Sequence, residues 1–228
     1  MSVAENLKVI MHRIAAAAKR AGRDPSSVRL VVVTKTVDVA RIRDAVASGA
    51  VILGENRVQE AGKKIEALGR IASWHLIGHL QTNKTKYAVK LFDLIHSVDA
   101  LELAAEIDLQ AAKIGKVQDI LIEVNIAGEA SKAGMAVKGA PALVRDAAKF
   151  KNISVRGLMT MPPYSENPEE SRPYFSVLRE LAETIAKENI PTVSMQELSM
   201  GMSGDFEVAI EEGATLVRVG TAIFGDRR

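Results

Sequence analysis

Two turns rich in small residues, close to the C-terminus, have the composition of an anion-binding site. Residues 197–225 are predicted as a strand, a turn, a short helix, a strand and a second turn. Small residues let a ligand approach the backbone closely, and free N–H groups at the start of a helix attract anions. The small residues of the two turns are Ser199, Gly201, Ser203, Gly204, Gly220 and Thr221. Turns on consecutive strands can form one cup, so this stretch predicts a phosphate site.

Lys35 is the residue best suited to react with a ligand held in such a cup. It follows the apolar run 30–33 and Thr34. A lysine at the end of a strand is often simply solvated. If it points into the mouth of a barrel, it loses hydration, and its neutral amine can attack a carbonyl group. An amine beside a phosphate cup suits a phosphorylated aldehyde or ketone, and pyridoxal 5'-phosphate (PLP) has both features.

Three further polar residues are expected near the ends of strands. Arg218 precedes the second turn, and it either forms an ion pair inside the barrel or donates to the phosphate or the pyridine nitrogen of PLP. An arginine remains charged and would leave that nitrogen unprotonated, which makes the ring a weaker electron sink. Asn56 is either a turn residue or a partner of the ring hydroxyl. His79 either makes a local polar contact or touches the ring.

Short apolar strands alternate with helices along the whole chain. The pattern predicts strands at 30–33, 51–53, 74–77, 94–98, within 117–126, and at 153–158, 197–199 and 216–219. Helices are expected between them, and an extra N-terminal helix at 3–21 is expected to help close the outer ring. We therefore predict an α/β fold, a single (β/α)8 TIM-type barrel in one domain over residues 1–228. An open doubly wound sheet is the alternative.

The barrel prediction also places the chemistry. In such barrels the site lies at the C-terminal ends of the strands, commonly with a phosphate cup after the last two. Lys35 on the first strand and the turns after the last two strands are then expected to face the same ligand.

Composition excludes several other classes of protein. The 228 residues include 30 basic and 28 acidic side chains, a net charge of +2 that makes no case for nucleic-acid binding. The chain contains no cysteine, which excludes disulfides and thiolate metal sites. No signal-peptide pattern and no membrane-length apolar run is present. We expect a cytoplasmic protein that is a monomer, because no long apolar stripe calls for a partner.

The remaining polar residues are expected to be structural. Lys63 and Lys64 read as ordinary charges on a helix surface, and His75 and His96 as side chains that pack or bond locally within strands. The histidine and acidic residues show no metal-ligand spacing, so we assign no metal.

Several longer strings resemble one known family. They are Val-Val-Val-Thr-Lys-Thr (31–36), Gly-Glu-Asn-Arg-Val-Gln-Glu (54–60), Trp-His-Leu-Ile-Gly-His-Leu-Gln-Thr-Asn-Lys (74–84), Glu-Val-Asn-Ile-Ala-Gly-Glu-Ala-Ser-Lys-Ala-Gly (123–134), Gly-Leu-Met-Thr-Met (157–161) and the whole of 198–225. Together they resemble the pyridoxal phosphate homeostasis proteins, the YggS/PROSC family, in order along nearly the full chain. The resemblance implies a barrel like the N-terminal domain of alanine racemase, with PLP on Lys35 as a Schiff base. By position, it implies that the cofactor is also held by Asn56, Ser203, Arg218, Gly220 and Thr221, and less directly by Ser199 and His79.

The chain also departs from the family pattern near the lysine. Val37 and Asp38 stand where the family usually has a second lysine and a proline, and Arg57 stands where an aromatic residue is usual. None of these changes removes a group from the expected cup. A role for a second lysine in cofactor exchange is not expected here.

Two classes of function compete for such a barrel. The first is a PLP-binding protein that stores, buffers or delivers the cofactor, with apo PLP-dependent enzymes as acceptors. The second is a PLP-dependent amino-acid racemase or decarboxylase, but the β-rich second domain of related enzymes is not expected in this chain. An open barrel mouth favours exchange of the ligand over carbanion chemistry. We therefore predict a carrier without robust catalysis. A phosphosugar-binding barrel with Lys35 as base is a third reading, which predicts a colourless protein.

Overall fold

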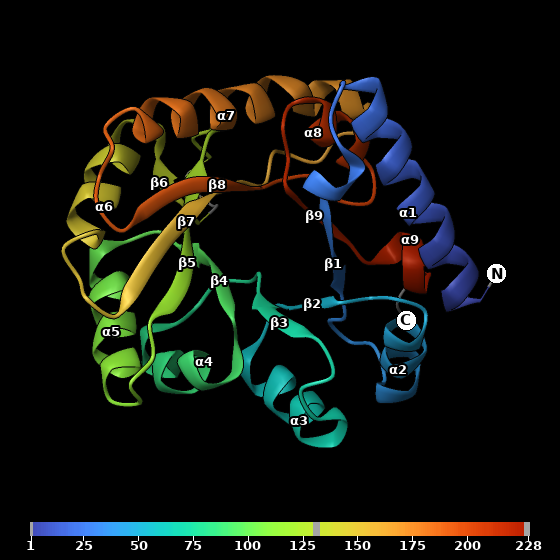
Figure 1. Cartoon of the computed structure of the whole chain (residues 1–228), viewed down its shortest axis with the longest axis horizontal. Helices are drawn as coiled ribbons and strands as arrows, with labels where there is room; N and C mark the ends of the chain where they lie inside the picture. Colours follow the sequence, from blue (N-terminus) through green and yellow to red (C-terminus); the bar gives the residue numbers. More distant parts are fainter. Residues whose placement is uncertain (1, 130–132, 226–228) are drawn as a thin grey trace.

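The computed structural model describes residues 2–129 and 133–225 and shows a closed barrel of parallel strands surrounded by helices (Figure 1). Its strands are β1 (Arg29–Val33), β2 (Ile52–Glu55), β3 (Ser73–Leu76), β4 (Leu94–Val98), β5 (Gln118–Asn125), β7 (Ile153–Met159), β8 (Val193–Ser199) and β9 (Leu216–Val219). They pair in the order β4-β3-β2-β1-β9-β8-β7-β5, and a further pairing between β4 and β5 closes the ring. The prediction of a (β/α)8 barrel is confirmed, and the open sheet is excluded.

The helices form the outer layer and follow the strands in turn. They are α1 (Val3–Arg20), α2 (Val39–Ala47), α3 (Val58–Leu68), α4 (Thr85–Leu91), α5 (Leu101–Ala112), α6 (Ala140–Ala147), α7 (Arg172–Ala186), α8 (Phe206–Glu211) and α9 (Thr221–Phe224), with 3-10 turns η1 (Pro25–Ser27), η2 (Thr82–Lys84), η3 (Val137–Gly139) and η4 (Pro168–Ser171). None of the helices in the described part of the chain is long and apolar enough to cross a membrane.

The extra N-terminal helix completes the outer ring. The last helix, α9, spans only Thr221–Phe224, and α1 packs against α8, α9 and α2 on that side of the barrel (Figure 1). A capping box between Ser2 and Glu5 fixes the start of α1. Its buried residues Leu7, Ile10 and Ile14 repeat at helical spacing and face the barrel.

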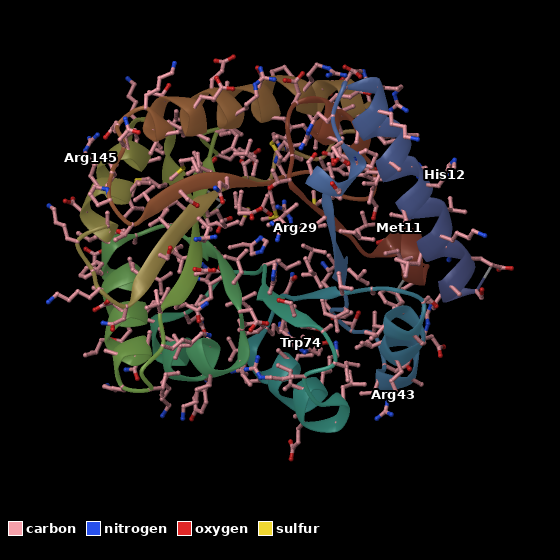
Figure 2. The ribbon with its side chains drawn as sticks, viewed as in Figure 1. Met11, His12, Arg29, Arg43, Trp74 and Arg145 are labelled. Carbon is pink, nitrogen blue, oxygen red and sulfur yellow. The ribbon has the colours of Figure 1, made fainter. Side chains whose placement is uncertain are left out.

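Strand alternation divides the core into two apolar layers. One cluster, which includes Val31 on β1 and Leu121 on β5, lies inside the barrel. The other, which includes Val32 and Trp74, fills the space between strands and helices. In Figure 2, Arg145 projects from the outer helix α6, whereas Trp74 lies between β3 and α3 and is fully buried.

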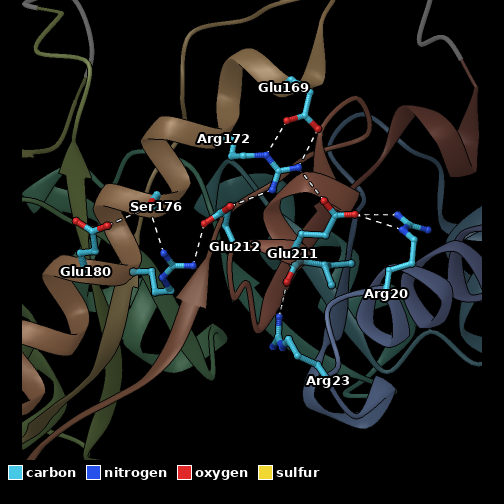
Figure 3. Close-up of polar contacts among 10 residues, drawn as sticks. Arg20, Arg23, Glu169, Arg172, Ser176, Glu180, Glu211 and Glu212 are labelled. Atoms are coloured by element: carbon cyan, nitrogen blue, oxygen red, sulfur yellow. Dashed lines mark hydrogen bonds and ion pairs between the residues drawn. The ribbon is translucent and has the colours of Figure 1, made fainter.

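A network of arginines and glutamates joins α1, α7 and α8 on the outside of the barrel (Figure 3). Arg172 contacts Glu211 at 2.8 Å and Glu212 at 2.9 Å, and Arg20 contacts Glu211 at 3.1 Å. Exposed ion pairs contribute little singly, but a shared network constrains the helices it joins. Helix α8 directly follows the first small-residue turn, so the network helps to fix that turn.

Two strand details differ from the sequence expectation. β8 begins at Val193, before the expected 197. Its first residues are only partly buried and do not form an apolar run, which is why the sequence pattern did not indicate them. A two-residue strand, β6 (Met135–Ala136), pairs with β5 outside the closed ring and was not expected. Neither difference changes the order of the barrel strands.

Candidate functional site

Lys35 lies in a tight turn just after β1, and its neighbours on both sides are held by one buried lysine. Nζ of Lys64 donates to the carbonyl oxygen of Thr34 at 2.6 Å, to Oε1 of Glu55 at 2.7 Å and to Oε1 of Glu60 at 2.7 Å. Glu60 also accepts from the backbone N–H of Thr36 at 2.6 Å. The turn that carries Lys35 is therefore anchored to β2 and α3.

The anchoring holds an unfavourable backbone conformation. Thr36 has a φ of 58°, in the left-handed region that a β-branched residue rarely adopts. Such a conformation persists only where surrounding contacts enforce it. Here the bond from Thr36 N–H to Glu60, together with the Lys64 contact to Thr34, supplies that enforcement.

Lys64 corrects the expectation from sequence. Its side chain is 8% exposed rather than a charge on the helix surface. Burial raises the pKa of Glu55, and its hydrogen bonds from Lys64 and Thr34 oppose that rise. Burial also acts on Glu60, but the hydrogen bonds from Lys64 and Thr36 lower its pKa below the ordinary value. Lys64 faces inward because it lies on the side of α3 that packs against β2.

Asn56 and His79 come from neighbouring strand ends and are brought together by a glycine. β2 and β3 pair in register from Ile52 to Glu55, so the residues after them leave the barrel side by side. A Cβ on Gly78 would lie 2.5 Å from the carbonyl oxygen of Asn56, closer than any side chain permits. Only glycine allows this approach, which places Asn56 and His79 on one wall.

The first small-residue turn leaves N–H groups available for a ligand. Gly201 has a φ of 87°, and a Cβ there would lie 2.5 Å from that of Ala209, so the turn requires glycine. Asp205 Oδ1 accepts from the N–H of Met202 at 2.6 Å and holds the turn closed. Within residues 2–129 and 133–225, the backbone N–H groups of Ser203 and Gly204 find no acceptor.

The expected site residues converge on one cavity of about 420 Å³ at the C-terminal ends of the strands. Seven of the eight line it: Lys35, Asn56, His79, Ser203, Arg218, Gly220 and Thr221. Met161, Pro163, Tyr164 and Ser165 from the loop after β7 also line it, and of these only Met161 was considered from the sequence as a possible lining residue. The sequence signal that could have indicated this loop is the proline pair Pro162-Pro163, which lies outside any helix or strand.

Two features of the cavity differ from expectation. Ser199 is fully buried behind Arg218 and is absent from the cavity wall, because β8 places it inside the barrel. Lys35 lines the cavity but is exposed, because the strand ends at Val33 and the lysine stands on the turn beyond it. The loss of hydration expected for Lys35 is therefore not produced by the barrel walls.

The guanidinium of Arg218 is held by hydrogen bonds to two neutral acceptors. It donates to Oγ of Ser199 at 2.5 Å and to the carbonyl oxygen of Thr160 at 2.9 Å. Burial lowers its pKa to about 10, so the guanidinium remains charged at neutral pH. The alternative of an ion pair inside the barrel is not seen among the ion pairs of the described residues. A positive charge therefore forms part of the cavity wall.

A pair of buried histidines extends the hydrogen-bond series from Arg218 and Ser199 across the barrel. Nδ1 of His96 lies 2.9 Å from Oγ of Ser199, and Nε2 of His96 lies 3.0 Å from Nδ1 of His75. Burial lowers the pKa of His75 to about 4 and that of His96 well below its ordinary value, so both rings are neutral at pH 7. Each contact in this hydrogen-bond series pairs one donor with one acceptor when Ser199 donates to His96 and His96 donates to His75.

Glu123 on β5 is a buried carboxyl group that the sequence did not single out. Burial and, to a smaller extent, the Asp99 carboxylate raise its pKa to about 7, against the opposing effect of Arg218. The ordinary pKa of 4.5 applies when the chain is unfolded. Between these values the folded protein retains a proton that the unfolded chain has lost, so raising the pH removes stability.

We expect Glu123→Gln to abolish this pH dependence. From below pH 4.5 to above pH 7, the free energy of unfolding of the variant should rise relative to wild type by an amount on the order of 3 kcal/mol. Chemical denaturation across this range measures the difference, in which the common contribution of the histidines cancels. A constant difference would mean that Glu123 titrates normally in the fold.

No cluster of three or more histidine or acidic side chains suited to a metal occurs among the residues that the structure describes. The chemical groups at the cavity include one lysine amine, one guanidinium, small hydroxyls and free backbone N–H groups, together with Asn56, His79 and the Asp205 carboxylate, which is already bonded to Met202 and Ser171. This set suits an anionic ligand that carries a carbonyl group.

Comparison with known proteins identifies the family. The family model described as alanine racemase, N-terminal domain, matches residues 6–228. A pyridoxal phosphate homeostasis protein of Aquifex aeolicus is 48% identical over 229 residues, covering 100% of both chains. The chain belongs to the pyridoxal phosphate homeostasis protein family.

Solved structures agree with the family and its fold. PipY of Synechococcus elongatus PCC7942, solved with PLP bound, is 37% identical with a TM-score of 0.82, covering 95% of this chain and 100% of that one. An alanine racemase of Clostridium difficile is 14% identical with a TM-score of 0.76, covering 98% of this chain and 57% of that one. At that identity the racemase shows a shared fold only. The resemblance inferred from the sequence is confirmed for the homeostasis protein family.

Proposed function

We propose that this chain, as a single domain over residues 1–228, binds PLP and acts in its intracellular homeostasis, storing, buffering or delivering the cofactor. The observation that carries the proposal is the cavity in which Lys35 and both small-residue turns meet. PLP supplies an aldehyde for a lysine amine and a phosphate for an anion cup. The PLP-bound relative PipY supports the same ligand.

Each half of the ligand has its own group of residues in this proposal. The Lys35 amine would hold the aldehyde carbon covalently, with loss of one water. Ser203, Gly204 and Thr221 hold the phosphate with hydroxyl and backbone N–H groups, which Gly220 leaves accessible. Both groups line the same cavity.

The ring is held between the two halves. Arg218 would face the ring as a charged donor, and Asn56 and His79, which line the same cavity, would border it. Arg218 is already bonded to Ser199 and Thr160, so its orientation is set before the ligand arrives. We assign Ser199 the role of orienting Arg218 instead of touching the cofactor.

The carrier role is favoured over a racemase or decarboxylase by the openness of the cavity. Lys35 is exposed, and Tyr164 on the rim is 88% exposed. Water therefore reaches the reactive end, which disfavours carbanion chemistry and favours exchange of the cofactor. A charged Arg218 at the ring also makes it a weaker electron sink. We propose a cytoplasmic monomer that passes PLP to apo PLP-dependent enzymes.

The phosphate half of the proposal is tested by removing single hydroxyl groups. Ser203→Ala and Thr221→Ala should each weaken PLP retention by about 1.5–3 kcal/mol, the usual contribution of a hydrogen bond to a charged group. Equilibrium dialysis of PLP, followed by its visible absorbance, measures the change. Ser165→Ala, which removes a hydroxyl from the cavity rim outside the turns, is the control and should retain PLP as wild type does. Unchanged affinity in both turn variants would place the phosphate elsewhere.

The absence of robust catalysis is tested separately. Wild-type protein loaded with PLP should racemise L-alanine at the background rate of free PLP, as followed by chiral chromatography. Turnover well above that background, lost in Lys35→Ala, would support the enzyme alternative.

A further inference from the structure

A second cleft, of about 760 Å³, lies beside the PLP cavity and shares a wall with it. It is formed by the start of α3 and the segment between β3 and α4. Its lining is Asn56, Arg57, Val58, Gln59, Glu60, Lys63, Gly78, His79, Gln81 and Lys84. Asn56, Gly78 and His79 belong to both hollows, so the cleft opens on the far side of the wall that borders the cofactor.

The charge of this cleft is unbalanced. Arg57, Lys63 and Lys84 all line it, and none of the three forms an ion pair with another residue of the described chain. The one acid on the lining is Glu60, whose carboxylate is already bonded to Lys64 and to the N–H of Thr36. Glu60 also interacts electrostatically with Arg57, so the lining carries three cations against one carboxylate, an excess of positive charge.

The backbone adds donors to the same side. Helix α3 spans 11 residues, and no side chain caps its start, where Arg57 occupies the capping position. Val58 and Gln59, in its first turn, line the cleft. Their N–H groups have no acceptor within residues 2–129 and 133–225. The positive end of the α3 dipole therefore lies at the cleft that the three cations line.

We propose that this cleft binds a second, phosphate-bearing small molecule, as free phosphate or as a phosphate ester. Arg57 offers the paired donors that suit a phosphate group, and Lys63 and Lys84 add point charges. The amide side chains of Gln59 and Gln81 supply further donors. The site is distinct from the PLP cavity and does not depend on PLP binding there.

Amide chemical shifts distinguish the two sites in one titration. Labelled wild-type protein would be titrated with inorganic phosphate and, separately, with pyridoxine 5'-phosphate, which has no aldehyde to react with Lys35. The amide signals of Val58 and Gln59 report the second cleft, and those of Ser203 and Gly204 report the proposed PLP cup. We expect saturable chemical-shift changes at Val58 and Gln59. The probe that binds more tightly there shows whether the cleft prefers free phosphate or a phosphate ester.

Matched charge variants make the test specific. Arg57→Gln with Lys84→Gln should weaken binding at Val58 and Gln59 at least tenfold. Lys86→Gln with Lys90→Gln removes the same charge from exposed positions on α4 that do not line the cleft, and should leave binding unchanged. Circular dichroism checks folding.

The proposal is overturned if Val58 and Gln59 do not respond to millimolar phosphate, or if both double variants weaken binding equally. A response at Val58 and Gln59 without one at Ser203 and Gly204 would support the second site while contradicting the proposed PLP cup.

Discussion

Replacing Lys35 by alanine is expected to abolish the covalent adduct between the protein and PLP. Lys35 lines the same cavity as the small-residue turns, and no other lysine of the described residues lines that cavity. Without its amine no bond to the aldehyde carbon can form there, so borohydride should trap an adduct only at background level. Because Lys35 is exposed, we expect the free energy of unfolding of the variant to differ from that of wild type by less than about 0.5 kcal/mol.

The measurement is the visible spectrum of PLP-loaded protein before and after borohydride reduction. Lys35→Arg retains the positive charge without a reactive amine and should behave like the alanine variant. Lys86→Ala removes an exposed lysine on α4 and should retain the full adduct. A wild-type level of adduct in Lys35→Ala would move the site to a different lysine.

Replacing Lys64 by methionine should destabilise the fold by about 3–5 kcal/mol, the usual cost of breaking a buried ion pair from one side. Methionine fills a similar space but leaves Glu55, which is fully buried, without its cation. Oε2 of Glu55 already has no hydrogen-bond partner, so the carboxylate has little else to compensate its burial. Urea denaturation at neutral pH measures the loss.

The adjacent residue supplies the control. Lys63→Met removes a lysine from the exposed side of α3 and should change stability by less than about 0.5 kcal/mol. Adding Glu55→Gln to Lys64→Met should recover part of the lost stability, because the unpaired charge is then gone. Equal effects of Lys63→Met and Lys64→Met would show that Lys64 is not buried as an ion pair.

The same variant examines how Lys35 is positioned. Lys64 holds the carbonyl of Thr34, and Glu60 holds the N–H of Thr36 in its left-handed conformation. If this support is lost, the turn is free to relax, and the Lys35 adduct should form more slowly in the folded fraction of Lys64→Met than in Lys63→Met.

The barrel and most of the site follow from local sequence signals. The run 30–33 is wholly apolar, and the segment 94–98 contains Leu94, Ile95 and Val98 around two polar residues. The structure has strands at Arg29–Val33 and Leu94–Val98. Because parallel strands end on the same side, residues just after them converge, which is why Lys35 and Arg218 meet at one cavity. Strand order did not need to be known for that prediction.

The parts that sequence reasoning missed depend on which way a side chain points. Lys64 occupies a position on α3 that is indistinguishable from Lys63 by residue type, yet packing buries one and exposes the other. Ser199 belongs to the same turn motif as Ser203, but its place on β8 directs it into the barrel toward His96 and Arg218. Such outcomes follow from strand register and helix rotation, which composition and spacing do not specify.

A crystal structure of the protein soaked with PLP tests the central claim most directly. We predict continuous electron density from Nζ of Lys35 to the aldehyde carbon, with the phosphate against Ser203, Gly204 and Thr221. Density attached to a different lysine, or a phosphate that lies away from both small-residue turns while Lys35 remains unmodified, would contradict the proposed site.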